Sequence, residues 1–333
     1  MPPTTGRQAW ADTLRGLAIG LMVFGHVVGG VATARPGDPA ADLLWAAYRY
    51  IYAFHMPAFL WVSGVFAPAS LRRSGRAAFL LDKLRTLAYP YLLWGLITWG
   101  CHAVMRGHTN SPFDPLTPVH ILFNPAAGFW FLYVLLLLMG GLAAVGPSAA
   151  GRLLFTAAAA GGYGATAWGM TADWPPAAGL AARHALWFAA GLWSARPAAA
   201  AARLPPAALL PAAGLGFAAV AALDAPLVDT AARGTAAAAA GTAALFALSA
   251  AGAGTAAGRA AGVAGRHSLE IYVASGIPSV LTRLLLVKGT GVTAFPALIV
   301  ACTAVGVGSP LALVWLARRL GVRRLFRWPP PRP

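Results

Sequence analysis

Charged side chains are scarce in this sequence. Lys, Arg, Asp and Glu make up 10% of the 333 residues, whereas an ordinary soluble domain carries roughly 25%. Apolar residues make up 59% and fall into blocks such as 14–32 and 126–145. A block of about 20 apolar residues can cross a hydrocarbon core of about 30 Å as a helix. The shortage of charge therefore excludes an ordinary soluble surface and favours membrane-spanning helices.

Cysteine is also rare. Cys101 and Cys302 both lie inside apolar segments, where a thiol usually packs as a small hydrophobic group. The sequence therefore predicts no disulfide and no metal site. The first residues, MPPTTGRQAWADTLRG, do not lead to a short apolar core with a small-residue cleavage site, so we expect this segment to be retained rather than removed as a signal peptide.

The apolar blocks predict an all-α integral membrane protein, a bundle of about ten transmembrane helices. We expect a single domain over residues 1–333, with a short, disordered, basic and proline-rich tail at about 322–333. The Ala- and Gly-rich region 152–254 is only weakly hydrophobic, so the number of spans is least certain there. The predicted spans cover residues 12–33, 43–68, 84–105, 127–146, 152–171, 178–195, 204–223, 235–254, 266–287 and 293–317.

The net charge of +16 would suit a nucleic-acid ligand, but the positions of the charges argue against it. Most basic residues lie in the loops between apolar blocks and at the C-terminus, including the stretches 72–85 and 318–332. Basic loops stay on the cytoplasmic side of a membrane. We therefore expect contacts with membrane lipids and no nucleic-acid partner. We also expect the chain to span the cytoplasmic membrane with both termini in the cytoplasm.

Ionisable side chains within a span are costly to place in lipid, so they are candidates for function. The first span contains Arg15 and His26 in DTLRGLAIGLMVFGH. Eleven residues make three turns plus about 20°, so both side chains project from one helix face, roughly 16 Å apart along the axis. A guanidinium binds phosphate or carboxylate, and an imidazole can accept a proton from a hydroxyl. The alternative is that Arg15 anchors the helix and His26 bonds to a neighbouring helix.

The second span reads RYIYAFHMPAFLWVSGVF and holds Arg49, His55 and Pro57. Pro57 should kink the helix and free a backbone carbonyl near His55. A bent helix with a polar lining is typical of a cavity, so His55 is a catalytic candidate and Arg49 a candidate for binding an anionic cofactor. The alternative is a structural histidine that is satisfied by a carbonyl.

Two further regions carry polar residues. Arg85, in DKLRTLAYPYLLWGL, should sit where an anionic cofactor would enter a span from the cytoplasm, although most such arginines contact lipid phosphates. The loop 106–126 contains His108, Asp114 and His120 and could either contact a substrate or only connect two spans.

Taken together, these segments resemble the acyltransferase-3 family of membrane acyltransferases. RQAWADTLRGLAIGLMVFGHVV is similar to that family's opening helix, with an arginine, ten residues and a histidine. FHMPAFLWVSGVF, KLRTLAYPYLLWGL and GFWFLYVLLLL resemble its next blocks, and RHSLEIYVAS resembles a late block. The resemblance covers about 1–140 and 262–287.

The resemblance implies an enzyme that takes an acyl group from acyl-coenzyme A, such as acetyl-CoA, in the cytoplasm and transfers it to a carbohydrate or glycoside hydroxyl. It implies that Arg15 and His26 are the essential pair. Ser275 stands where that late block commonly has a histidine, so a second imidazole from that block is not expected.

Glu270 is the only glutamate in the chain. An unpaired carboxylate inside a membrane would be protonated, so we expect a basic partner such as Arg49, Arg183 or Arg283. Glu270 then either orients His26 as part of the catalytic machinery or locks two helices together.

The interpretation from sequence places CoA phosphates on Arg15, with Arg85 and Arg49 as further candidates, and makes His26 the general base, with an acyl-histidine as a variant. No metal takes part, and an oligomer is left open. The rival function is a secondary transporter or flippase for a lipid-linked sugar, whose broken helices and midplane polar groups would look similar. No inverted repeat is evident between the two halves.

Overall fold

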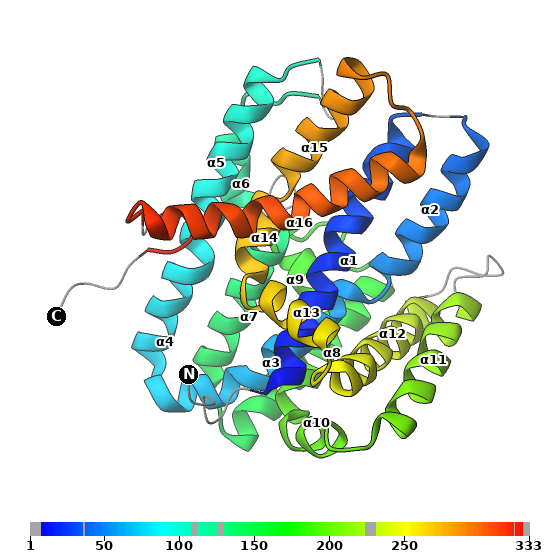
Figure 1. The fold of residues 1–333 in the computed structure, drawn as a ribbon. Coiled ribbons are helices and arrows are strands. Elements are labelled where there is room, and N and C mark those ends of the chain that lie inside the picture. Colours follow the sequence, from blue (N-terminus) through cyan, green and yellow to red (C-terminus); the bar gives the residue numbers. More distant parts are fainter. Residues whose placement is uncertain are drawn as a thin grey trace. The chain divides into compact units, whose positions relative to one another are not determined.

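A computed structural model describes residues 8–35, 37–107, 112–124, 129–223, 231–322 and 324–328. Helices make up most of the described part of the chain, and no strand occurs among those residues. The prediction of an all-α fold is confirmed (Figure 1).

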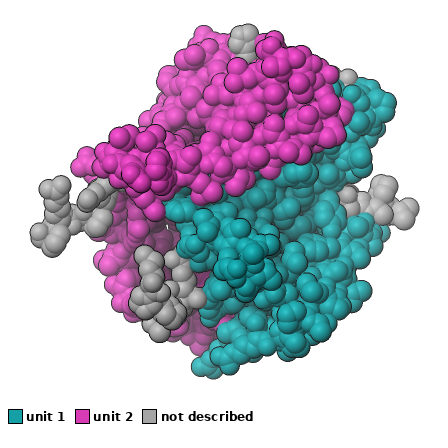
Figure 2. Space-filling model, in the orientation of Figure 1, with its two compact units in different colours: residues 1–59, 196–272 teal, residues 60–195, 273–333 magenta. Residues whose placement is uncertain are grey.

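The chain divides into two units, coloured separately in Figure 2. Unit 1 contains Met1–Phe59 and Arg196–Tyr272. Its helices are α1 (Ala9–Thr33), α2 (Pro39–Tyr52), the start of α3 (His55–Ser74), most of α10 (Ala195–Ala201), α11 (Pro206–Leu223), α12 (Ala231–Gly252), α13 (Ala256–Arg266) and most of α14 (Ser268–Ala274).

Unit 2 contains Leu60–Ala195 and Val273–Pro333. Beyond the remainder of α3, its helices are α4 (Arg76–Lys83), the π-helix η1 (Leu84–Ala88), α5 (Tyr89–Val104), α6 (Thr117–Phe123), α7 (Trp130–Val145), α8 (Ala149–Ala167), α9 (Pro176–Trp193), α15 (Gly276–Leu284), the π-helix η3 (Leu285–Gly289) and α16 (Phe295–Arg319).

A helix corresponds to each predicted span, but fewer helices are long and apolar enough to cross a membrane by themselves. Among the described residues five pass that test, or six if the pair Ser268–Ala274 and Gly276–Gly289, interrupted at Ser275, forms one span. α5 and α7 are only 16 residues long. The chain is therefore a multi-pass membrane protein, whereas ten spans with both termini in the cytoplasm stays a prediction.

The tail expected to be disordered makes specific contacts where the structure describes it. Phe326 stacks on Trp94 with ring centroids 5.3 Å apart, and the Trp94 indole N–H donates to the Leu325 carbonyl at 2.9 Å. The Arg327 guanidinium lies 2.9 Å from the Asp82 carboxylate. Residues 324–328 are thus packed against α4 and α5, and residues 323 and 329–333 lie outside the described part of the chain.

Candidate functional site

The first half of α1 lies in backbone contact with α13. A Cβ added at Gly16 would meet the Ala261 carbonyl, and one at Gly265 would meet the carbonyl of Asp12. The Thr13 hydroxyl also donates to the Gly258 carbonyl at 3.2 Å. Small residues allow such close helix packing in membranes. The glycines therefore fix the part of α1 that carries Asp12 and Arg15.

The second half of α1 packs against α2 through two further glycines one helical turn apart. A Cβ at Gly25 would lie 2.9 Å from the Tyr52 ring, and one at Gly29 would lie 2.9 Å from the Tyr48 ring. The two tyrosine rings stack on each other with centroids 3.9 Å apart. Gly25 and Gly29 thus make the space in which two aromatic rings of α2 stand beside His26.

His26 is hydrogen-bonded to Tyr52. The Tyr52 hydroxyl oxygen lies 2.8 Å from Nδ1 and 3.4 Å from Nε2 of the imidazole. Since 2.8 Å is an ordinary hydrogen-bond length and 3.4 Å is long, we assign the bond to Nδ1. The rings meet edge to face with centroids 5.8 Å apart. His26 is an exposed residue of the chain, and access of a substrate to Nε2 stays a prediction.

His55 lies three residues after Tyr52, and its ring contacts the Tyr52 ring. Its side chain is buried, with 1% of its surface exposed, and its Nδ1 donates to the Ile51 carbonyl at 2.8 Å. Such a bond fits the alternative given in the sequence analysis, a structural histidine that is satisfied by a carbonyl. The helix is interrupted between Tyr52, where α2 ends, and His55, where α3 begins, but Pro39–Ser74 forms one candidate span, so a kink at Pro57 stays a prediction. The Ile51 carbonyl also accepts a bond from the Phe54 N–H at 3.3 Å.

The second nitrogen of His55 has no such bond. Its Nε2 atom is buried and has no hydrogen-bond partner among the described residues. Leaving a buried polar atom unpaired costs about 1–3 kcal/mol, so it calls for a reason. The His55 and Tyr52 rings meet edge to face with centroids 4.7 Å apart. Tyr52 therefore stands between two imidazoles.

Arg15 lies three helical turns before His26 on α1. Its Nη1 atom is 3.7 Å from the Asp12 carboxylate, and 28% of the side-chain surface is exposed. The same carboxylate lies 3.9 Å from Nη1 of Arg266, at the end of α13. One buried acid thus holds two guanidinium groups.

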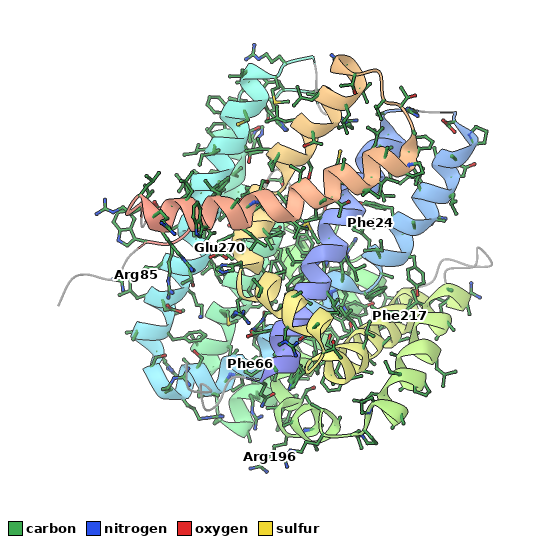
Figure 3. The ribbon with its side chains drawn as sticks, viewed as in Figure 1. Phe24, Phe66, Arg85, Arg196, Phe217 and Glu270 are labelled. Carbon is green, nitrogen blue, oxygen red and sulfur yellow. The ribbon has the colours of Figure 1, made fainter. Side chains whose placement is uncertain are left out.

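Glu270, labelled in Figure 3, is paired within its own region of the chain. Its carboxylate lies 3.6 Å from Nδ1 of His267, three residues earlier in the chain, and an arginine partner for Glu270 stays a prediction. Arg49 is exposed at the end of α2. Contact of Glu270 or Arg49 with the reacting groups stays a prediction.

Arg85, also labelled in Figure 3, belongs to unit 2 and lies in the π-helix η1. Its backbone carbonyl accepts a hydrogen bond from the Trp328 N–H at 3.2 Å. π-Helices occur often at functional sites. The described tail residues thus contact the segment that carries this candidate.

The predicted outer loop contains a local network centred on Asp114. The Asp114 carboxylate accepts bonds from the Leu116 N–H at 2.9 Å and from His120 Nδ1 at 2.8 Å. The bond from the Leu116 N–H, together with those from His120 and Thr117, holds the pKa of Asp114 below its ordinary value. His108 lies outside the described residues, and contact of this loop with a substrate stays a prediction.

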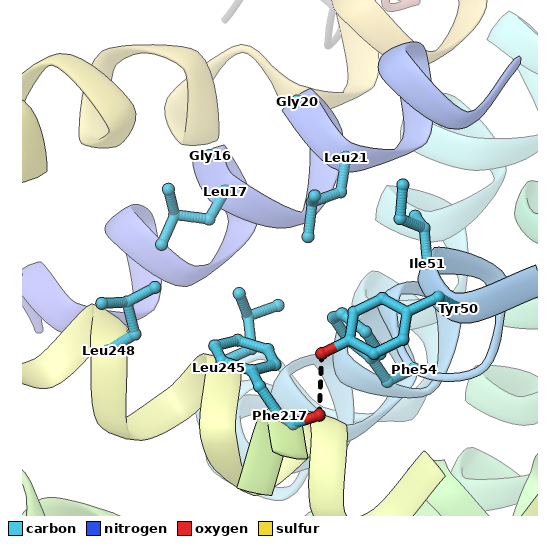
Figure 4. Close-up of a pocket in the computed structure, with 10 residues that line it drawn as sticks. All are labelled: Gly16, Leu17, Gly20, Leu21, Tyr50, Ile51, Phe54, Phe217, Leu245 and Leu248. Atoms are coloured by element: carbon cyan, nitrogen blue, oxygen red, sulfur yellow. Dashed lines mark hydrogen bonds between the residues drawn. The ribbon is translucent and has the colours of Figure 1, made fainter. Parts of the chain in front are cut away.

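Unit 1 also contains an apolar cavity of about 550 Å³ (Figure 4). The hydroxyl of Tyr50, on its wall, already donates to the Phe217 carbonyl at 2.8 Å. The residues of α1 that line the cavity are Gly16, Leu17, Gly20 and Leu21. At roughly 100° per residue these positions face away from Arg15 and His26. The cavity suits a hydrocarbon chain and is separate from the face that carries the candidate site.

Comparison with known proteins identifies the family. The acyltransferase-3 family model, described as an acyltransferase domain, matches residues 8–315. The chain belongs to the acyltransferase-3 family. It is also similar to the nodulation protein NolL of Mesorhizobium japonicum, with 24% identity over 136 residues, which is 39% of this chain and 34% of that protein. The match therefore spans about a third of that relative's length. No solved structure matches the chain.

Two residues enter the candidate site that sequence reasoning did not select. Tyr52 lies in the quoted block RYIYAFHMP, three residues before His55, but a tyrosine in a span usually reads as an interface or core residue. Asp12 lies three residues before Arg15, a spacing that predicts an ion pair on a helix. The described residues contain no group of three His, Cys, Asp or Glu that could hold a metal ion.

Proposed function

We propose that this protein is an O-acyltransferase that moves an acyl group, acetyl being the first to test, from acyl-CoA to a hydroxyl of a sugar or glycosylated product. The observation that carries the proposal is the exposed residue His26 with the Tyr52 hydroxyl at Nδ1 of its imidazole. The family supports the reaction class, and the chemistry of a positioned imidazole supports transfer to a hydroxyl.

The proposed reaction uses His26 as general base and then as general acid. With Nδ1–H donating to the Tyr52 oxygen, the Nε2 lone pair accepts the proton of the acceptor hydroxyl. The hydroxyl oxygen bonds to the thioester carbonyl carbon, the C–S bond breaks, and the CoA thiolate takes the proton back from Nε2. An ester and free CoA result. A transient acyl-histidine is the variant in which His26 itself first attacks the thioester.

Arg15 would bind the phosphates of CoA, with Arg85 and Arg49 as further candidates. A guanidinium forms paired hydrogen bonds with phosphate oxygens. We further propose ten spans in the cytoplasmic membrane with both termini inside, because the basic loops and tail would then face the cytoplasm. Acyl-CoA would arrive on that side.

Incubation of the purified protein with radiolabelled acetyl-CoA and a mixture of surface glycans and secreted glycosides tests this function. We expect free CoA to be released and label to enter a carbohydrate fraction. Uptake of a lipid-linked sugar into vesicles without thioester turnover would contradict the enzyme and support the transporter or flippase.

A further inference from the structure

The end of α13 places a second arginine beside Arg15. Arg15 and Arg266 lie 3.7 Å and 3.9 Å from different oxygens of the Asp12 carboxylate. These distances are longer than the roughly 2.7–2.9 Å of a charge-assisted hydrogen bond. Asp12 therefore orients two guanidiniums without closing a tight bidentate pair on either.

Exposure separates the roles of the three groups. The Asp12 side chain is 7% exposed, whereas those of Arg15 and Arg266 are 28% and 43% exposed. A ligand can thus reach the two arginines but hardly the acid. Within the described residues, these three side chains carry two positive charges and one negative charge, a combination that suits an anion, and removing Asp12 would remove a carboxylate that both arginines contact.

The surrounding backbone fixes this arrangement. The close contacts of Gly16 with Ala261 and of Gly265 with Asp12 hold α1 and α13 together. The neighbouring charged groups are Arg259, whose guanidinium donates to the Gly254 carbonyl at 2.7 Å, and the His267–Glu270 pair at 3.6 Å. The Glu270 carboxylate thus lies beside an imidazole.

We propose that Arg266 and Arg15 form a binding site for phosphate groups of the acyl-CoA donor, with Asp12 as the positioning residue. The inference rests on the proposed function, because it assumes a CoA thioester as donor. It adds Arg266 to the donor site and explains why a buried carboxylate stands between two basic residues. Phosphate oxygens accept bonds from both guanidinium forks, which a lysine ammonium cannot reproduce.

The test measures binding of CoA, dephospho-CoA and pantetheine, which carries no phosphate, to the detergent-solubilised protein by calorimetry. Each ligand lacks a phosphate or nucleotide group of the one before. Arg266→Gln should weaken CoA binding roughly 10- to 100-fold, the range for a lost hydrogen bond to a charged group. The loss of affinity caused by Arg266→Gln should be smaller for the ligands that lack the phosphate contacted by Arg266. Arg266→Lys should fall between wild type and Arg266→Gln.

Arg259→Gln is the matched control, because Arg259 is an exposed arginine of the same helix. The CoA affinity of this variant should stay at the wild-type value. Equal losses for all three ligands, or no loss with Arg266→Gln and Arg266→Lys, would overturn the site while leaving the CoA donor intact. Failure of the wild type to bind any of the three ligands would contradict the donor itself, and this site with it.

Discussion

Tyr52→Phe is the substitution that separates positioning of His26 from packing. It removes one hydroxyl oxygen, which lies 2.8 Å from Nδ1 of His26, and keeps the ring that stacks on Tyr48 and fits against Gly25. In the proposed mechanism Nδ1–H donates to that oxygen, so its removal takes away the bond that favours the tautomer with a proton on Nδ1. The Nε2 lone pair is then present in a smaller fraction of molecules.

The size of the effect follows from the energy of one neutral hydrogen bond. Such a bond contributes about 0.5–1.5 kcal/mol net, and about 1.4 kcal/mol corresponds to a tenfold change in rate. We therefore expect kcat for acyl transfer to fall roughly 2- to 12-fold. KM should stay unchanged, because the bond lies behind the imidazole, on the side away from the proposed substrate.

Tyr50→Phe provides the matched control on the same helix. It removes a hydroxyl whose partner is the Phe217 carbonyl at 2.8 Å, on the wall of the apolar cavity. Both variants should insert into the membrane in wild-type amounts, and only Tyr52→Phe should lower kcat. Equal rates for Tyr52→Phe and wild type, or equal losses for the two variants, would refute the positioning of His26 by Tyr52.

Three further outcomes are expected. Gly25→Ala should lower the rate of acyl transfer, because the added Cβ pushes the Tyr52 ring away. Gly30→Ala, whose added Cβ would meet nothing within 4 Å, should leave that rate unchanged. Equal rates for the two variants would contradict the packing of Tyr52 on Gly25. Trp94→Ala should speed tryptic cleavage of the tail more than Asp82→Asn, because the exposed Arg327–Asp82 ion pair contributes only about 0–1 kcal/mol. Faster cleavage of the tail in Asp82→Asn would contradict this ranking of the two contacts. In a variant without Cys101 and Cys302, a cysteine at 74 should resist an impermeant maleimide in intact cells and one at 116 should react; the reverse labelling would place the donor site outside.

The tail contact also carries a pH expectation. Burial alone raises the pKa of the Asp82 carboxyl, but the bond from Lys83 and the charges of Lys83 and Arg327 outweigh it and hold the pKa below its ordinary value. A group with a lowered pKa stabilises the folded state above its unfolded pKa of about 3.9 and loses that effect as pH falls through the folded value. Protection of the tail should therefore be the same at pH 8 and pH 6. A loss within that range would point to a different titrating group.

The fold class followed from composition and block length, because a chain with so few charges has little alternative to apolar helices. The number of helices able to span by themselves did not follow. The span predicted at 266–287 is interrupted at Ser275, whereas the one predicted at 43–68 lies within Pro39–Ser74, which passes the test as one span. Hydropathy reports how apolar a window is, whereas helix breaks depend on the local backbone conformation.

The site was predicted in part. The helical period put Arg15 and His26 on one face of α1, since that relation needs only a continuous helix. The partners came from other helices and were not predictable in the same way. Tyr52 reaches His26 only because Gly25 leaves space for its ring, and Arg266 reaches Asp12 only because α13 packs on α1. Tertiary contacts of this kind have no signature in a single sequence.

The central claim is that His26 performs acyl transfer, and one comparison tests it most directly. Mass spectrometry of surface glycans and secreted glycosides would be carried out on a deletion strain that expresses either the wild-type chain or His26→Ala. The account predicts acylated carbohydrate with the wild type and a loss of roughly 10²- to 10⁴-fold with His26→Ala, at equal amounts of membrane-inserted protein. Acylation at the wild-type level in a properly inserted His26→Ala protein would contradict it.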